Sequence, residues 1–263
     1  MSPSVGRRTP GRITWKASDA WFCALVLIAL QLWIDGWLRI GARLNPGFAH
    51  WLSTVFSRGT FMVLDCILWL LIVFLFAHAQ SVHQFLEHVG LKQRLTLYGW
   101  SAAWGAIAIG LLGRYAVAKG WTPPGERFSA FWYGGVAARW FLIMRFVLMV
   151  PIYEEITMRG FLYRAFRGRY GQFISTTLIL CVVTFFHWRL VSHAMFSFVC
   201  VESGAILLCV IRERTGNLWN CILFHAAYNA TIFLSWPVYM IGMLLLFPYC
   251  SRRTSSLLSG GSE

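Results

Sequence analysis

The stretch TFMVLDCILWLLIVFLFAHA, residues 60–79, is twenty residues long and nearly free of charge. As an α-helix rising about 1.5 Å per residue, it would cross the ~30 Å hydrocarbon core of a bilayer. Seven further apolar runs occur in the chain, at approximately 19–38, 95–112, 140–162, 173–190, 193–211, 217–235 and 237–250. The last is the weakest, since its helix would reach only about 21 Å. The pattern predicts an all-α, polytopic transmembrane helical bundle of about eight spans.

Composition agrees with this interpretation. Of the 263 residues, 58% are hydrophobic and only 13% are charged, whereas a water-soluble domain carries roughly a quarter charged residues. A soluble globular protein is therefore excluded. Neither an internal repeat nor a low-complexity segment divides the chain, so we expect a single membrane domain over residues 1–263.

The net charge of +13 is informative through its distribution. In a soluble protein it would suggest nucleic-acid binding. If the spans alternate from a cytoplasmic N-terminus, 14 Lys and Arg residues fall on the cytoplasmic side, 8 fall on the opposite side, and Arg145 lies within a span. Because basic residues favour the cytoplasmic side, the distribution predicts a multi-pass membrane protein with both termini cytoplasmic and with no nucleic-acid partner.

The connection QSVHQFLEHVGLKQR, residues 80–94, has a different pattern. Val82, Phe85, Leu86 and Val89 recur near helical spacing beside polar residues. Such a pattern is typical of a helix lying in the membrane interface. We expect an interfacial amphipathic helix near 80–94 that contacts membrane lipids.

Two of the ten acidic residues, Glu154 and Glu155, are adjacent in the run 140–162. Ionisable groups inside a membrane are costly and usually functional, and neighbouring carboxylates suit a proton acceptor working near neutral pH. Arg159 follows Glu155 by four residues, one helical turn on. It is expected to neutralise Glu155 and to leave Glu154 facing another direction. The alternative is that the Glu–Arg pair only ties a helix end to the lipid headgroups.

Three polar side chains of the later runs complete the candidate set. His187 follows an aromatic-rich run, and His225 and Asn229 are spaced to share one helix face. Polar groups in an apolar bundle need partners. Together with a glutamate they could activate water and stabilise an oxyanion, which peptide hydrolysis requires. The alternative for each histidine is a hydrogen-bonded residue of the helical core.

These residues resemble a known family. The string Glu154-Glu155-x-x-x-Arg159-Gly160, the histidine at 187 and the string Gly216-x-Leu218-Trp219-x-x-Ile222-x-x-His225-x-x-x-Asn229 resemble the CAAX-protease and bacteriocin-processing (CPBP or ABI) family of intramembrane endopeptidases, which includes the type II CAAX prenyl endopeptidases. The resemblance covers about 140–235, the expected catalytic core.

The resemblance implies roles for the matching residues. Glu154 is expected to be the general base that activates water, His187 to hold that water, and His225 with Asn229 to support the water and the oxyanion. Glu155 and Arg159 are expected to be structural. The family pattern usually has Phe four residues before the histidine, where this chain has Val183. A glutamate-type mechanism without a metal or other cofactor is implied, with zinc as the alternative, since Glu and His side chains can also bind zinc.

The resulting hypothesis is an intramembrane endopeptidase, a hydrolase that cleaves near the C-terminus of a membrane-anchored or lipidated protein, in the cytoplasmic membrane of a bacterium. A sorting or maturation role is expected. The alternatives are a non-catalytic bacteriocin-immunity or binding protein and a transporter, for which repeats and broken helices give no support.

The predicted ends of the spans place the candidate catalytic residues at different depths in the membrane. Measured from cytoplasmic ends near 162, 173 and 217, Glu154 and His225 would lie about 12 Å deep and His187 about 21 Å deep. The fifth span is therefore expected to start later, to tilt or to be irregular.

Overall fold

The structure, a computed structural model, describes residues 15–44, 47, 60–79, 81–119, 136–188 and 195–233. Within these ranges all regular elements are helical, as predicted. Their bounds are α1 Ala17–Leu44, α3 Thr60–Phe76, α4 Val82–Val89, α5 Leu97–Ala118, α7 Val136–Ile143, η1 Met144–Met149, α8 Val150–Glu155, η2 Ile156–Leu162, α9 Tyr163–Phe186, α11 Met195–Thr215 and α12 Leu218–Phe233.

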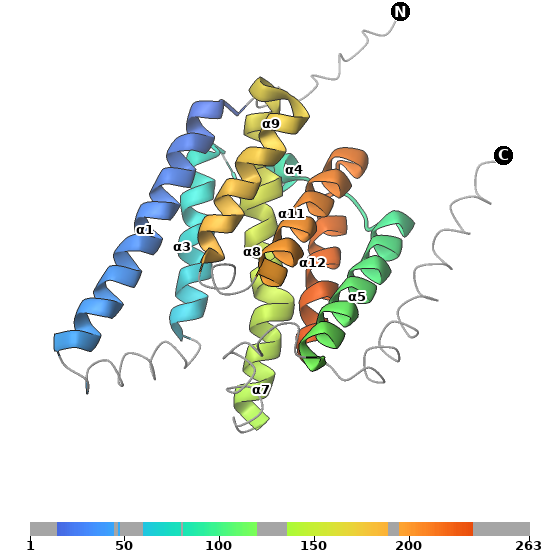
Figure 1. Ribbon diagram of the computed structural model, residues 1–263. Coiled ribbons are helices and arrows are strands. Elements are labelled where there is room, and N and C mark those ends of the chain that lie inside the picture. The colour runs from blue at the N-terminus through green and yellow to red at the C-terminus, as the bar shows by residue number, and fades with distance from the viewer. Residues whose placement is uncertain are drawn as a thin grey trace, which may run out of the picture.

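The helices form a bundle around a central column made by α7, η1, α8 and η2 (Figure 1). Helices α1 and α3 pack together on one side of this column, while α12 and α5 pack on the other. Helix α11 contacts both α9 and α12. Five of the six residues expected at the site therefore lie on helices, and His187 is the C-cap residue that follows α9.

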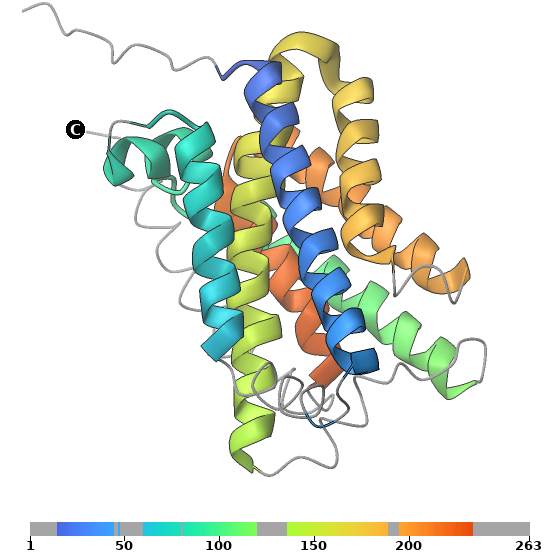
Figure 2. The same cartoon turned by 90° about the vertical axis from the view of Figure 1, so that its left-hand side faces the viewer.

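The central helix is longer than the sequence predicted. It continues beyond 162 to Tyr170 and breaks only at Gly171, where φ is 76° and ψ is 177°; a positive φ is accessible to glycine at little cost. The predicted end at 162 was wrong because Arg164, Arg167 and Arg169, which suggest a loop, are exposed on continuing helical turns. Figure 2 shows the chain turning over at this point and descending as the rest of α9.

This turn removes the inconsistency in depth. Glu154 precedes the turn at Gly171 by 17 residues, and His187 follows it by 16. In two antiparallel helical arms, each rising about 1.5 Å per residue, both residues therefore lie about 24 Å from the turn. The central helix and the second arm of α9 bring Glu154 and His187 to the same level.

Helices α5 and α12 approach closely through small residues. A Cβ atom added at Gly99 would lie 2.2 Å from Asn220 Oδ1, and one added at Gly110 would lie 2.1 Å from Thr231 Oγ1. Ala103 lies between them and is fully buried. A stripe of small residues that lets two backbones come close is typical of helix packing in membranes.

The predicted helix within 80–94 is confirmed as α4. Ser81 caps its N-terminus by accepting a hydrogen bond from the Gln84 backbone N–H at 3.2 Å. Gly90, with φ 89°, ends it in the left-handed conformation. Phe85 and Val89 are buried, so the helix is amphipathic. Its position at a membrane interface stays a prediction.

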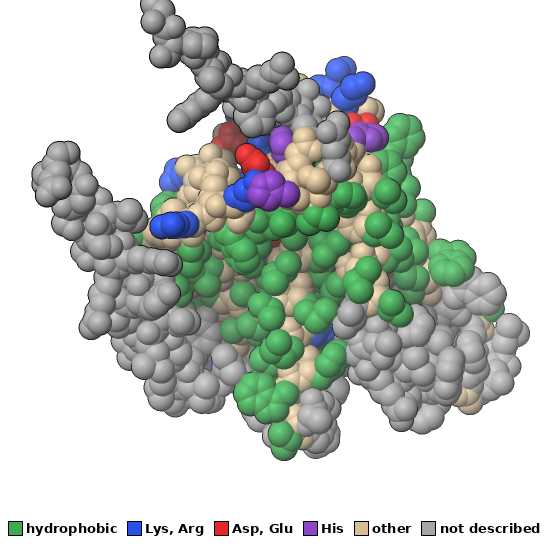
Figure 3. Space-filling view, turned by 180° about the vertical axis from the view of Figure 1, so that it is seen from behind, with side chains coloured by type: hydrophobic (Ala, Val, Ile, Leu, Met, Phe, Trp, Pro, Cys, Tyr) green, Lys and Arg blue, Asp and Glu red, His purple; other side chains and the backbone are tan. Residues whose placement is uncertain are grey.

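The surface has large apolar areas. Exposed fractions reach 62% for Phe22, 57% for Leu32, 61% for Leu75 and 83% for Phe173. Figure 3 shows most visible charged and histidine side chains at one end, above a face of hydrophobic side chains. Exposed apolar surface of this extent marks contact with a membrane or a partner.

The prediction of about eight spans is not confirmed. Of the described helices, only Ala17–Ile34 is long and apolar enough to cross a membrane, with a mean hydropathy of 1.7, while Leu64–Phe76 and Leu97–Gly113 are shorter apolar segments. Helix α11 carries Glu202, and Arg212 and Arg214 lie in its last turn. The run 237–250 lies outside the described residues.

Candidate functional site

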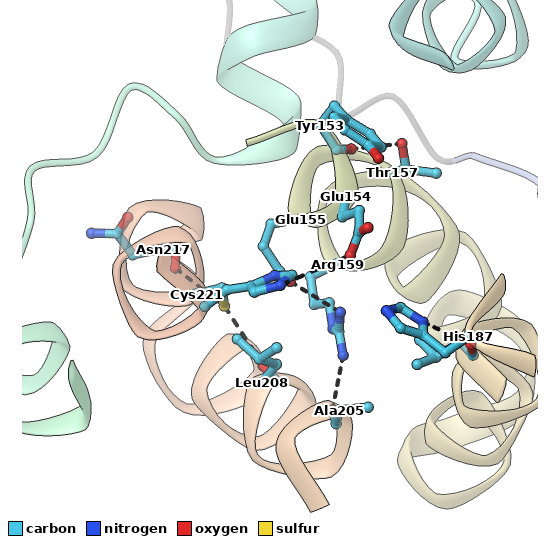
Figure 4. Close-up of polar contacts among 12 residues, drawn as sticks. Tyr153, Glu154, Glu155, Thr157, Arg159, His187, Ala205, Leu208, Asn217 and Cys221 are labelled. Carbon is cyan, nitrogen blue, oxygen red and sulfur yellow. Dashed lines mark hydrogen bonds and ion pairs between the residues drawn. The ribbon is translucent and has the colours of Figure 1, made fainter. Parts of the chain in front are cut away.

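The predicted pairing of Glu155 with Arg159 is confirmed. Arg159 Nη1 lies 3.1 Å from Glu155 Oε1, and the two side chains are 3% and 0% exposed. Arg159 Nη2 also donates a 3.0 Å hydrogen bond to the carbonyl of Ala205 on α11 (Figure 4). A buried ion pair of this kind holds its surroundings in one geometry. It links the central helix to α11.

His225 on α12 joins this pair to Glu154. Its Nδ1 lies 2.9 Å from Glu155 Oε1, and its Nε2 lies 3.9 Å from Glu154 Oε2. The side chains of Glu154 and His225 are 17% and 15% exposed, whereas Glu155 is fully buried. The adjacent carboxylates thus differ in environment as the sequence predicted: Glu155 is enclosed by the ion pair, and Glu154 is partly accessible.

The contacts define the protonation of His225. An ionised carboxylate only accepts hydrogen bonds, so Nδ1 of His225 carries the proton that faces Glu155. When Nε2 is protonated as well, the group of Glu154, Glu155, Arg159 and His225 is electrically neutral. The N–H group at Nε2 of His225 is then a hydrogen-bond donor on the side of the ring that faces Glu154.

Asn229 is held by an irregularity of the central helix. In the π-helical segment η1 the Val150 N–H bonds to the carbonyl of Arg145, and Pro151 has no N–H to offer. In a continuous helix the carbonyl of Phe146 would accept a hydrogen bond from the N–H of residue 150 or 151. Neither group is available to it here. Asn229 Nδ2 donates to that carbonyl at 2.9 Å. This bond uses one of two amide protons, and the other remains on the same nitrogen.

His187 lies at the C-terminal end of α9. Its Nδ1 lies 3.0 Å from the carbonyl oxygen of Val183, so Nδ1 donates and Nε2 of a neutral ring is an acceptor. In Figure 4 the imidazole points to the side of Glu154 and Arg159. Val183 thus contributes its backbone carbonyl to the position of His187.

An aromatic stack lies beside this end of α9. Phe186 packs against Trp69 of α3 at 4.7 Å between ring centroids, and Trp69 packs against Tyr153 at 5.4 Å. Tyr153 directly precedes Glu154. The three rings connect the neighbours of both predicted catalytic residues, Glu154 and His187.

Two ionisable residues of the same bundle, Glu202 and Asp65, were not recognised from the sequence. Thr184 Oγ1 donates a 2.6 Å hydrogen bond to Glu202 Oε1, and Glu202 is only 9% exposed. Asp65 on α3 interacts electrostatically with Arg145 and with Glu154. The signal that could have found them was available, since each lies within a predicted span, where ionisable groups are rare.

The donor atoms give no preformed metal site in the part of the chain that the structure describes: no three His, Cys, Asp or Glu side chains are grouped as metal ligands there. Whether the reaction needs a metal stays a prediction. All four predicted catalytic residues and both structural ones lie within the described residues.

Comparisons with known proteins agree with the resemblance found in the sequence. Residues 136–231 match the family model described as "Type II CAAX prenyl endopeptidase Rce1-like", a segment that contains Glu154, Glu155, Arg159, His187, His225 and Asn229. Searches of curated proteins and of solved structures return no match. Over residues 136–231 the chain is therefore similar to the Rce1-like family of membrane-associated CAAX-type proteases, as the resemblance in the sequence predicted.

Proposed function

We propose that this protein is an intramembrane endopeptidase that hydrolyses a peptide bond near the C-terminus of a membrane-anchored or lipidated protein. The proposal is supported by the family match over residues 136–231 and by one observation above all. His225 contacts Glu155 at 2.9 Å and approaches Glu154 to 3.9 Å, so a partly accessible carboxylate, a histidine and a buried ion pair form one connected group.

The proposed reaction begins with a water molecule between Glu154 and His187. Both can accept its protons, Glu154 through its carboxylate and His187 through Nε2. Glu154 removes one proton as the water oxygen attacks the carbonyl carbon of the scissile bond. The tetrahedral intermediate carries its negative charge on the former carbonyl oxygen. Protonated Glu154 then returns the proton to the leaving nitrogen as the carbon–nitrogen bond breaks.

The oxyanion needs donors that are already in place. In this proposal they are Nε2–H of His225 and the second amide proton of Asn229. Glu155 and Arg159 hold the imidazole of His225 through Nδ1, while the carbonyl of Phe146 holds Asn229. No step is assigned to a metal or another cofactor.

The cellular setting is part of the proposal. The protein would be a single multi-pass domain with its catalytic core at 140–235, in the cytoplasmic membrane of a bacterium with both termini cytoplasmic. The excess of basic residues on one side of the predicted spans supports this orientation. The substrate class would be a host protein with a C-terminal anchor or lipid, processed during sorting or maturation.

The test is co-expression with small membrane proteins encoded near its gene, followed by measurement of their C-terminal masses. The wild type is compared with Glu154→Gln, His187→Ala and His225→Ala, and with Glu213→Gln as a control at an exposed carboxylate. Loss of a C-terminal segment with the wild type and the control, but with none of the other three, is expected. Equal masses in all five would support a non-catalytic immunity or binding protein instead.

A further inference from the structure

Two ionisable side chains near Glu154 have no role in the reaction proposed above. Asp65 belongs to α3 and Arg145 to η1, and Asp65 interacts electrostatically with both Arg145 and Glu154. Asp65 and Arg145 are each partly exposed, so a ligand can reach them. Ionisable groups within predicted spans are expensive to maintain and are usually functional.

Packing places Asp65 on the face of α3 that meets the central helix. Asp65 precedes Trp69 by four residues, so the two share one face of the helix. Trp69 contacts Tyr153 at 5.4 Å between ring centroids, next to Glu154. Asp65 therefore lies one helical turn before Trp69 on α3, closer to the level of Arg145 on the central helix.

The π-helical segment η1 determines where Arg145 points. In an uninterrupted α-helix, Arg145 and Glu154 would be nine residues and about 900° apart, which places them on opposite faces. A π turn contains about one extra residue, and this shifts the angular position of Arg145 relative to Glu154 around the helix axis by about 100°. The remaining angle is roughly 80°, so Arg145 lies on the Glu154 side of the helix. Without η1 the guanidinium would point away from the site.

We propose that Arg145 binds the terminal carboxylate of the substrate, with Asp65 as a second carboxylate in its vicinity. This rests on the proposed function, since it concerns the same cleavage site. A guanidinium has five N–H donors and can bind two carboxylates on different edges, one of them in a bidentate manner. The guanidinium carbon of Arg145 also lies 4.7 Å from the centroid of the Phe146 ring, which limits the orientations of the guanidinium plane.

The spacing fits a short C-terminal fragment. Glu154 and Arg145 are separated by roughly 12 Å along the helix axis. An extended peptide advances about 3.4 Å per residue, so three to four residues would connect the scissile bond with a carboxylate at Arg145. A carboxylate entering a largely apolar bundle must find a cation there, because leaving it unpaired is costly. Arg145 would thereby select substrates that end close to the cleavage site.

The experiment uses two synthetic peptides and purified protein in lipid–detergent micelles. One peptide carries a farnesylated cysteine followed by three residues, and the other is an apolar helix with a three-residue polar tail. Each is made with a free C-terminal carboxylate and as the C-terminal amide. The wild type is expected to cleave the free acid of at least one peptide with a kcat/KM about tenfold or more above that of its amide, mainly through KM.

Variants separate recognition from packing. Arg145→Gln and Asp65→Asn are expected to reduce the preference for the free acid to about twofold or less, Arg145→Lys to retain part of it, and the exposed control Arg167→Gln to retain all of it. A merely structural role of Arg145 predicts instead that Arg145→Gln lowers cleavage of acid and amide by the same factor.

The outcomes also separate this inference from the function on which it rests. If the wild type cleaves acid and amide equally well, the subsite is refuted while the protease function stands. If the wild type cleaves neither peptide, the proposed function is refuted and the subsite with it. If Arg145→Gln does not fold, the wild-type comparison and Arg145→Lys still decide.

Discussion

Replacing Glu155 by Gln is expected to destabilise the protein strongly because it leaves the guanidinium of Arg159 buried without its charge partner. The two side chains are 0% and 3% exposed, and Arg159 Nη1 lies 3.1 Å from Glu155 Oε1. Two unit charges at this distance attract by about 5 kcal/mol at an effective dielectric constant near 20. Removing one member of a buried pair typically costs about 3–5 kcal/mol. We expect a loss in this range in the free energy of unfolding.

The double variant Glu155→Gln, Arg159→Met should recover much of this loss, since removing both charges also removes the cost of burying them. Reversible unfolding in mixed micelles would measure the single variants, the double variant and the control Glu213→Gln. That control breaks the 2.8 Å pair with Arg167, whose side chains are 29% and 42% exposed, and should cost less than about 1 kcal/mol. The reasoning is refuted if the losses of the two single variants simply add in the double variant.

Three other predictions concern packing, positioning and the metal. Gly110→Ala should destabilise by about 1–3 kcal/mol because its Cβ would meet Thr231, whereas Gly105→Ala, with nothing within 4 Å, should stabilise by up to about 1 kcal/mol; equal unfolding energies would contradict the close α5–α12 contact. Asn229→Ala should lower both cleavage and stability, the latter by about 1–3 kcal/mol, while His187→Ala, whose ring bonds within its own turn, should lower mainly cleavage. Cleavage should persist in the presence of a strong chelator such as 1,10-phenanthroline, and its loss with recovery on adding zinc would establish the metal alternative.

The helices and the residues of the site could be predicted from the sequence to a large extent. Apolar runs gave most helices to within a few residues, because burial and lipid contact both require long apolar segments. The i, i+4 spacing of Glu155 and Arg159 predicted their ion pair, which depends only on helix geometry. A glutamate, His187, His225 and Asn229 were expected to converge in the bundle, and His225 lies 3.9 Å from Glu154. The contact of His225 with Glu155 was not predicted.

Other features left no readable signal in the apolar pattern. The π-helical segment η1 changes the phase of the central helix, but hydrophobic periodicity does not distinguish an extra residue per turn, and Pro151 was the one local indication. The continuation of the helix past 162 was not predicted, because exposed arginines are compatible with a loop as well as with the end of a helix. Arg145 was recognised as an intramembrane charge and Asp65 could have been, but the relation of Arg145 to Glu154 depends on the turn that η1 introduces.

The central claim, that Glu154 activates the attacking water, is tested most directly by the kcat/KM of purified Glu154→Gln for a peptide that the wild type cleaves. Glutamine keeps the size of the side chain and one accepting oxygen but cannot accept the proton. We predict a loss of at least about 100-fold, in the range of general-base catalysis, with the free energy of unfolding unchanged within about 1 kcal/mol, as for a partly exposed side chain. A rate within threefold of the wild type would contradict the claim.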